Sequence, residues 1–355
     1  MHSSDKMSRR GFGTLVAAAA LALPGVAHAA KRPRKRMTHT LIKPPRLNQG
    51  DTIAILAPGG RTNEEAIGRA AARIESLGFS VRLGANLREV HGNYAGTVQQ
   101  RLDDLHRAFA DPEVKGIWCI RGGSGCISLL AHIDYELIRR HPKVLIGYSD
   151  ITALHLALYR KIGLVTFHGP VASSGIADYT HRQLLAVVAD PQPEYIIGQS
   201  MENRVRALTE PHYGIRTVRE GVATGRLIGG NLSLVSALAG TPYAADLAGA
   251  LVYLEEVNEE PYRLDRWMTQ LDLASPFAKA AGMMIGICDN CGPVEGETAL
   301  TLDETLDIHL QPLQVPAVTG YSFGHIRNQF TLPVGVNARL DTAAETLTLL
   351  EPAVL

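Results

Sequence analysis

The stretch Val144-Leu-Ile-Gly-Tyr-Ser-Asp-Ile-Thr152 determines the expected fold and contains the strongest chemical feature of the sequence. The short apolar run 144–146 predicts a buried strand, Gly147 ends it, and the apolar spacing of 151–160 predicts a helix. Ser149 is therefore expected on the tight turn between strand and helix. Such a turn pushes a serine hydroxyl out of the sheet and directs backbone N–H groups toward a reacting oxygen, as in a nucleophile elbow.

A simpler interpretation is that Ser149 only caps the helix. Serine is a preferred N-cap residue because its hydroxyl accepts a hydrogen bond from an otherwise unpaired backbone N–H. The G-x-S-x-G pattern of many serine hydrolases is not met, because Asp150 and Ile151 follow the serine. This stretch alone leaves both interpretations open.

Apolar strands alternate with amphipathic helices on both sides of this stretch. This alternation predicts a parallel sheet with both faces covered by helices, whose ligands collect beyond the carboxyl ends of the strands. In the first half of the chain we expect strands over 52–58, 81–84, 114–120 and 164–170, and helices over 62–78 and 97–110.

The second half has the same α/β character and is expected to end in a hairpin before Leu350. Residues 191–221 have mixed polarity and no clear period, which is typical of a linker. We therefore expect an N-terminal parallel-sheet domain with the nucleophile over 45–205 and a C-terminal α/β domain over 206–355. The active site is expected at their interface. Further strands are expected over 250–254, 283–287 and 315–319, and helices over 232–239 and 262–271.

Composition and charge limit the classes of function. The chain has 355 residues, 46% of them hydrophobic, which is enough for two folded domains with substantial cores. Residues 1–36 hold eight basic residues and one acidic residue, which leaves 27 basic and 34 acidic residues over 37–355. The folded part is thus mildly acidic, which disfavours a nucleic-acid partner because phosphate binding requires a basic face.

The N-terminus has the pattern of an export signal. Ser8-Arg9-Arg10-Gly11-Phe12 is a twin-arginine pattern, a short apolar run follows over 15–23, and Ala27-His28-Ala29 resembles a cleavage site. The apolar run is too short for a lasting membrane span. We expect a signal peptide over 1–30, a basic leader over 31–44 and a periplasmic mature protein.

Four cysteines form two pairs in sequence, Cys119 with Cys126 and Cys288 with Cys291. Half of a zinc site or a disulfide could use a Cys-x-x-Cys pair, but no second such pair completes a metal site. Buried, unpaired thiols are the expected state, with a Cys288–Cys291 disulfide as the alternative.

The loop Arg121-Gly-Gly-Ser-Gly125 follows an expected strand and allows three interpretations. Its glycines could cradle a phosphate, although the spacing of a dinucleotide or P-loop motif is absent. They could instead let the backbone approach a substrate and donate an N–H to an oxyanion. A plain tight turn is the third interpretation, and the loop alone does not decide among them.

An activated serine needs a base, and the base needs an acid that orients it. His325 follows an expected strand and a glycine, and His168 is its rival. Glu255 is the first residue beyond an apolar strand, whereas the later glutamates Glu256, Glu259 and Glu260 are expected on a solvated face. The residues themselves do not select one set.

Over roughly 45–350, ordered motifs at matching intervals give the chain a specific resemblance to the LD-carboxypeptidase family, serine peptidases of the Ser-Glu-His type that include microcin-immunity peptidases. The motifs are Ala57-Pro58-Gly59, Arg121-Gly-Gly, Ile146-Gly-Tyr-Ser-Asp150, His168-Gly-Pro170, Gly229-Gly-Asn-Leu232, Leu254-Glu-Glu-Val-Asn-Glu259 with Asp265-Arg266, Phe323-Gly-His325 and Thr331-Leu-Pro-Val-Gly335.

The resemblance implies roles for particular residues. It places the nucleophile at Ser149, the orienting acid at Glu255 and the base at His325. Oxyanion donors are implied in the backbone of Asp150 and in Gly122 or Gly123. Substrate contacts are expected from Arg121, Asn231 and Arg266, the two arginines being candidates for binding a free carboxylate. Neither a metal nor an organic cofactor is implied.

The function implied by the resemblance is removal of the C-terminal D-alanine from peptidoglycan tetrapeptides. One alternative is a related peptidase or amidase that cleaves a peptidyl-nucleotide toxin with the same triad. The other is a non-catalytic periplasmic binding protein, since such proteins also bind ligands at strand ends. A peptide from peptidoglycan is the expected partner, and the sequence leaves monomer or homodimer open.

The export hypothesis predicts a mature N-terminus near Ala30 in a periplasmic fraction, measured by N-terminal sequencing. Changing both Arg9 and Arg10 to lysine should leave the precursor in the cytoplasm, because the transport route reads the arginine pair. Export of the double variant at the level of the unchanged chain would contradict the twin-arginine assignment.

Overall fold

The first sheet is built around the strand that precedes Ser149. A computed structural model of the chain describes residues 40–175, 177–296 and 298–355. Five strands run parallel in the order β5-β4-β3-β1-β2, and β12 is antiparallel to β5 at one edge. Every residue of β4 is buried, which explains why the sequence shows a continuous apolar run there. The strands are β1 (Thr52–Leu56), β2 (Ser80–Leu83), β3 (Val114–Cys119), β4 (Val144–Gly147), β5 (Phe167–His168) and β12 (Leu332–Pro333).

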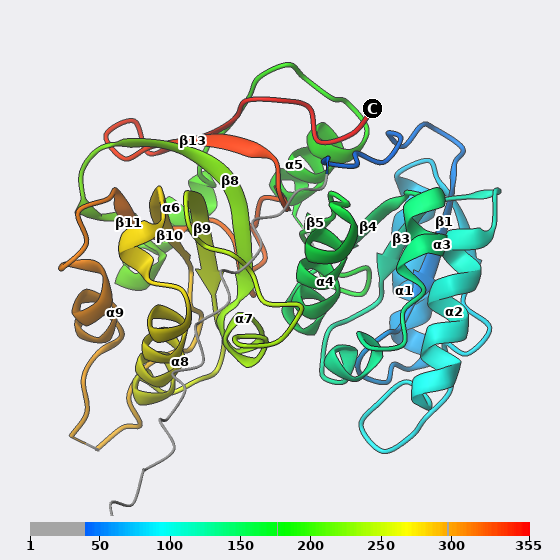
Figure 1. Cartoon of the computed structure of the whole chain (residues 1–355), viewed down its shortest axis with the longest axis horizontal. Helices are drawn as coiled ribbons and strands as arrows, with labels where there is room; N and C mark the ends of the chain where they lie inside the picture. The colour runs from blue at the N-terminus through cyan, green and yellow to red at the C-terminus, as the bar shows by residue number, and fades with distance from the viewer. Residues whose placement is uncertain (1–39, 176, 297) are drawn as a thin grey trace, which may run out of the picture. The chain divides into compact units, whose positions relative to one another are not determined.

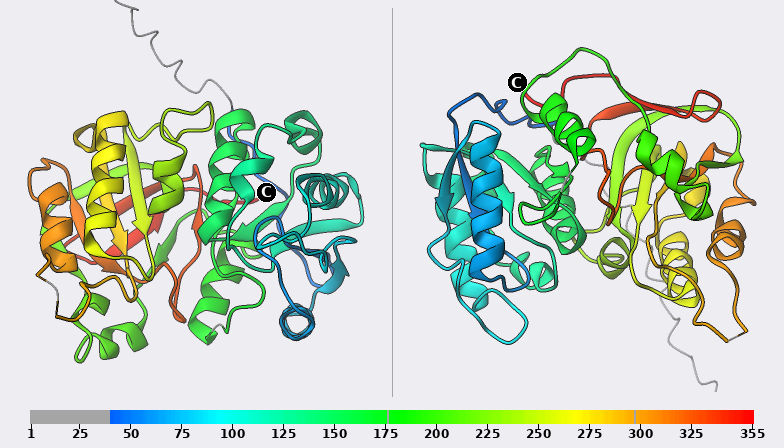
Figure 2. Two further views of the ribbon diagram at one scale, coloured as in Figure 1. Left: turned by 90° about the horizontal axis from the view of Figure 1, so that it is seen from below. Right: turned by 180° about the vertical axis from the view of Figure 1, so that it is seen from behind.

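Helices cover both faces of this sheet. The helix α1 lies in front of the sheet in the right view of Figure 2, whereas α2 and α3 lie in front of it in Figure 1. Asn63 caps α1, and Thr97 with Gln100 forms a capping box at α2, which agrees with the expected helix starts. The helices are α1 (Glu64–Ser76), α2 (Val98–Ala110), η1 (Cys126–Leu129), α3 (Tyr135–Arg140), η2 (Ser149–Ile151), α4 (Thr152–Ile162) and α5 (Asp178–Val188).

The second sheet has the order β6-β14-β13-β8-β9-β10-β11-β7. Its central strands β8 to β11 are parallel, and β13 and β14 form the predicted closing hairpin. The helices of this half are α7 (Leu232–Ala237), α8 (Pro261–Ala274), η4 (Phe277–Lys279) and α9 (Leu302–Leu310). The strands are β8 (Val222–Asn231), β9 (Ala250–Glu255), β10 (Gly282–Gly286), β11 (Ala317–Tyr321), β13 (Asn337–Asp341) and β14 (Thr346–Leu349). The predicted α/β class is confirmed.

The linker expected over 191–221 is wrong. That segment forms β6 (Tyr195–Ile197), α6 (Met201–Arg206), η3 (Pro211–Tyr213) and β7 (Arg216–Arg219). The two strands are the outermost strands of the second sheet, one at each edge. Both strands are short, with three and four residues, and β7 carries an arginine at each end, so neither shows the longer apolar run that marks a central strand. The predicted boundary at residue 205 stays a prediction, although β6 precedes it and pairs with β14.

The two sheets meet along α4. Both belong to one compact unit, residues 39–355, and α4 packs against α7 and β8, as Figure 1 shows. A Cβ added to Gly230, whose φ is +140°, would lie 2.5 Å from Thr152 Cγ2, so β8 approaches the start of α4 only because this residue is glycine. Within the described residues, no helix is long and apolar enough to cross a membrane. The predicted signal peptide lies outside the described residues, as does the leader up to residue 39.

Candidate active site

Ser149 lies on a strained turn between β4 and α4. Its φ is +63°, in the left-handed region that side chains other than glycine rarely adopt. No side chain caps η2 or α4, whose N-cap residues are Tyr148 and Ile151, so the capping interpretation of Ser149 is wrong. Backbone strain of this kind persists where the surrounding structure enforces it, and it is concentrated at functional sites. The predicted strand–turn–helix geometry is confirmed.

The glycine loop after β3 lies directly against this turn. A Cβ added to Gly122 would be 2.7 Å from Ser149 Cβ, 2.9 Å from Ser149 Oγ and 3.0 Å from the backbone nitrogen of Asp150. Gly60 N–H donates a hydrogen bond to Gly122 O at 2.8 Å. Gly123, with φ of +91°, packs on Gly60 instead of on the serine. Gly122 is therefore the loop residue that adjoins the hydroxyl.

The side chain of Asp150 fixes the turn to the same loop. Its Oδ2 accepts a hydrogen bond from Cys126 N–H at 2.9 Å, and burial raises the pKa of the carboxyl. The backbone nitrogen of Asp150 lies next to Gly122, on the side where Gly122 contacts Ser149. The side chain thus has a structural role, while the backbone N–H remains the predicted oxyanion donor.

Glu255 and His325 come together from the ends of β9 and β11. His325 Nδ1 and Glu255 Oε2 are 2.7 Å apart, and the glutamate side chain is fully buried while 17% of the imidazole is exposed. Burial by itself raises the pKa of Glu255, but the adjacent His325, together with His168 and Asn231, outweighs it, and the pKa is lowered. Burial likewise opposes the charge on His325, but Glu255, together with Glu256 and Asp289, outweighs it and raises the pKa of the imidazole.

Tyr148 connects this pair to the serine turn. Its ring centroid lies 4.5 Å from that of His325, and Ser149 is the next residue along the chain. The rival base His168 lies behind Tyr148, with ring centroids 6.1 Å apart, and is completely buried. Burial lowers the pKa of His168 to about 4, so it stays neutral at ordinary pH and has no surface from which to reach a substrate. The geometry favours His325 as the base.

Sequence models of the two domains of one protein family match the chain. The LD-carboxypeptidase N-terminal domain matches residues 53–169, and the LD-carboxypeptidase C-terminal domain matches residues 224–340. The chain belongs to the LD-carboxypeptidase family. It is therefore a hydrolase of the carboxypeptidase class.

Named relatives agree with this assignment. A probable murein peptide carboxypeptidase of Bacillus subtilis is 38% identical over 86% of this chain and 93% of its own. A murein tetrapeptide carboxypeptidase of Pseudomonas aeruginosa is 31% identical over 81% of this chain and 92% of its own. The crystal structure of an MccF-like protein from Bacillus anthracis superposes with a TM-score of 0.75 at 30% identity, over 87% of this chain and 99% of that one.

Asn231 and Glu256 form a buried hydrogen-bond network beside Glu255. Asn231 Nδ2 donates to Glu256 Oε1 at 2.8 Å, and Asn231 N–H donates to Thr152 Oγ1 at 3.0 Å. Glu256 also accepts from Ser233 N–H at 3.0 Å, and only 4% of it is exposed. The expected solvated position of Glu256 is therefore wrong, because the Asn231 side-chain amide and the Ser233 N–H at the start of α7 satisfy the buried carboxyl. The side chain of Asn231 is engaged in these contacts, and its substrate role stays a prediction.

The two predicted arginines of the carboxypeptidase occupy different places. Arg121 directly precedes Gly122, and its Nη1 donates to Arg61 O at 3.0 Å. Arg266 lies on α8, with its guanidinium 5.3 Å from the centre of the Tyr262 ring. Arg121, but not Arg266, thus lies in the loop that packs against Ser149.

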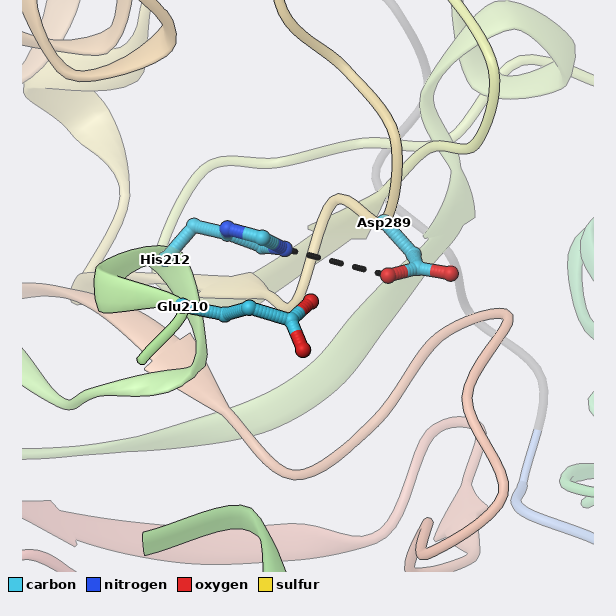
Figure 3. Close-up of side chains that lie close together, drawn as sticks. All are labelled: Glu210, His212 and Asp289. Atoms are coloured by element: carbon cyan, nitrogen blue, oxygen red, sulfur yellow. Dashed lines mark ion pairs between the residues drawn. The ribbon is translucent and has the colours of Figure 1, made fainter. Parts of the chain in front are cut away.

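The sequence did not indicate a cluster of three metal-ligand residue types, shown in Figure 3. Glu210, His212 and Asp289 each place one ligand atom within 4.8 Å of the others. Arg206 binds Glu210 through two hydrogen bonds of 2.6 and 2.8 Å, and Tyr213 donates to Asp289 at 2.7 Å. Since these contacts satisfy both carboxylates, we interpret the cluster as an ion-pair network. Asp289 is distant in sequence from Glu210 and His212, and the three match no motif that could have revealed the cluster.

All four cysteines are buried and unpaired, which confirms the expected thiols. Burial raises the pKa of Cys119 and of Cys126. These two thiols are therefore poor nucleophiles.

The Glu255–His325 contact predicts the pH dependence of the carboxypeptidase. A protonated His325 cannot accept a proton, so kcat/KM should fall as the pH drops through a pKa above the ordinary value of about 6.5. Glu255→Gln removes the carboxylate but leaves the burial, so the inflection should move to lower pH and kcat should fall by ~100-fold or more.

The measurement is kcat/KM against pH for alanine release from a peptidoglycan tetrapeptide. Glu259→Gln is the matched control, because it removes the same charge from the loop after β9, where Glu259 pairs with Arg263. An unshifted inflection in Glu255→Gln would show that this carboxylate does not act on the base.

Proposed function

We propose that the protein is a serine LD-carboxypeptidase that removes the C-terminal D-alanine from peptidoglycan tetrapeptides. Ser149 is the nucleophile, His325 the base and Glu255 the orienting acid. The observation that carries this proposal is the 2.7 Å bond between His325 and the buried Glu255, beside the strained turn of Ser149. A serine, a base and an acid that fixes the base make up the set that nucleophilic acyl transfer requires.

In the proposed reaction, Ser149 Oγ attacks the carbonyl carbon of the last peptide bond while His325 Nε2 takes the hydroxyl proton. The backbone amides of Asp150 and of Gly122 or Gly123 stabilise the resulting oxyanion. Collapse breaks the C–N bond, and His325 returns the proton to the nitrogen of the leaving D-alanine. Water, deprotonated by His325, then hydrolyses the acyl-serine. Glu255 holds the Nδ1 proton and stabilises the imidazolium that forms twice in this cycle.

The periplasm is the proposed location. The twin-arginine pattern and the Ala27-His28-Ala29 site support export, and peptidoglycan is assembled and degraded outside the cytoplasmic membrane. An exported enzyme of this kind would act on the wall itself or on fragments released from it.

A second candidate is cleavage of a peptidyl-nucleotide toxin by the same triad. The observation that favours it is the similarity to the MccF-like structure. Its sequence identity to this chain, 30%, is close to the 31% of the P. aeruginosa relative. Family membership argues against the third hypothesis, a binding protein without catalysis.

Ser149→Ala should abolish alanine release and leave the melting temperature almost unchanged, because it removes one hydroxyl from a turn where that hydroxyl caps nothing. The loss in kcat should be ~10⁴-fold or more, and His325→Ala and the double variant should lose nearly as much, because groups that act as a unit are not additive.

The assay is mass spectrometry of muropeptide tetrapeptides after incubation, with a peptidyl-nucleotide included as a second substrate. Loss of one alanine in a Ser149-dependent manner supports the proposal, and turnover of the nucleotide alone would replace it with the second candidate. Losses that multiply in the double variant would show that Ser149 and His325 do not share one proton.

A further inference from the structure

A cavity of about 550 Å³ opens at the carboxyl ends of β1 and β3. Its lining includes Arg61 and Asn63 from the loop that leads into α1, Arg121 from the glycine loop, and Ser173 beyond β5. In parallel sheets, ligands bind at this end of the strands. The cavity therefore lies where the fold places a substrate.

The cavity is cationic in a protein whose folded part is acidic. Arg61 and Arg121 contribute two positive charges, and none of the described residues that line it is acidic. Two acidic residues follow Asn63 in the sequence, and both form ion pairs on the surface: Glu64 with Arg88, and Glu65 with Arg69. Residues 37–355 as a whole contain seven more acidic than basic residues, so the charge of the cavity is opposite in sign to the net charge of the folded part.

Arg121 is held in place for binding. One of its five donors bonds Arg61 O at 3.0 Å, which orients the guanidinium. This bond uses the backbone of Arg61, so the Arg61 side chain can be changed without losing it. Two arginines on one rim present planar donor pairs that match a carboxylate.

The cavity adjoins the nucleophile. Arg121 is followed by Gly122, whose added Cβ would touch Ser149 Oγ at 2.9 Å. On the other side Ser173 hydroxyl donates to Ile120 O at 2.6 Å, which fixes Ser173 to the end of β3. The loop that contributes Arg121 to the cavity is therefore the same loop that packs against Ser149.

We propose that Arg61 and Arg121 form a subsite that binds a carboxylate of the peptide substrate; this inference rests on the proposed function. A tetrapeptide offers two sources: its C-terminal carboxylate, and the side-chain carboxylate of a third residue such as diaminopimelate. Arg266 does not line this cavity, so the choice between the two arginines expected from the sequence falls on Arg121. Arg61 is a new specificity residue, two positions beyond the Ala57-Pro58-Gly59 motif.

The test measures binding without turnover. Ser149→Ala protein is titrated calorimetrically with the free tetrapeptide, with its C-terminal amide, and with the peptide that carries lysine in place of diaminopimelate. Adding Arg61→Gln should weaken binding of the free acid ~10- to 100-fold, the range expected for loss of charge-assisted hydrogen bonds. Arg121→Gln should do the same.

Arg69→Gln is the matched control, because it removes the same charge from the same helix region and pairs with Glu65 outside the cavity. Melting temperatures of all variants show that they fold. In the protein with Ser149 intact, Arg61→Gln should raise KM more than it lowers kcat, because the contact is made equally before and during the reaction.

The two peptide analogues identify the source of the carboxylate. If amidation weakens binding to the protein that retains Arg61 but not to Arg61→Gln, the arginines bind the C-terminal carboxylate. If replacing diaminopimelate by lysine weakens binding to the protein that retains Arg61 but not to Arg61→Gln, they bind the side-chain carboxylate of the third residue. If neither analogue binds more weakly than the free acid, or if both arginine variants behave as Arg69→Gln does, the subsite is overturned. If the subsite is overturned but the unchanged enzyme still releases alanine, the proposed function stands. If the arginines bind the carboxylate selectively but the unchanged enzyme releases no alanine, the proposed function is rejected and the subsite stands.

Discussion

A buried carboxylate constrains this structure more than any other group. Glu255 has no exposed side-chain surface, and an unpaired charge in such a place costs several kcal/mol. His325 supplies the partner, and the loop after β11 must come close enough to deliver it. Gly324, with φ of +119°, permits that approach, because a Cβ there would lie 3.2 Å from Glu255 Cβ. The position of the imidazole thus follows from the need to compensate one charge.

The same constraint extends to the joint between the sheets. Asn231 binds Glu256 next to Glu255, and its N–H binds Thr152 at the start of α4, so the carboxylate pair is linked to the serine turn by two hydrogen bonds. The left-handed backbone of Ser149 costs of order 1–3 kcal/mol. Burial of most of α4 offsets that cost, and the helix contacts elements of both halves, α3 and β5 in the first and α7 and β8 in the second.

How far the sequence leads depends on whether a feature is local. The turn at Ser149 follows from an apolar run, a glycine and a helical period within a few residues. The outer strands β6 and β7 bury little and so show no period, and they were mistaken for a linker. Glu255 and His325 are distant in sequence from Ser149, and only the resemblance to a family selected them. Glu256 and Arg61 could not be assigned from the sequence. A glutamate is expected in solvent unless its buried hydrogen-bond donors are known, and no sequence motif marks an arginine in a loop as a binding residue.

Stability and catalysis make opposite demands on the Glu255–His325 pair. The pKa of Glu255 is lowered by folding, so its contribution to stability is present above its unfolded pKa of about 4.3 and is lost as the pH falls through the folded value. The pKa of His325 is raised, so its contribution is fully present below about 6.5 and is lost as the pH rises through the folded value. The pair therefore stabilises the fold most between these two unfolded values, where the imidazole is charged. In the proposed mechanism catalysis needs the neutral imidazole and so requires a pH above the raised pKa, where the contribution of His325 to stability is lost. His168, kept neutral by burial, adds no second positive charge beside His325, so it does not oppose the raised pKa of that imidazole, and the two pH ranges stay apart.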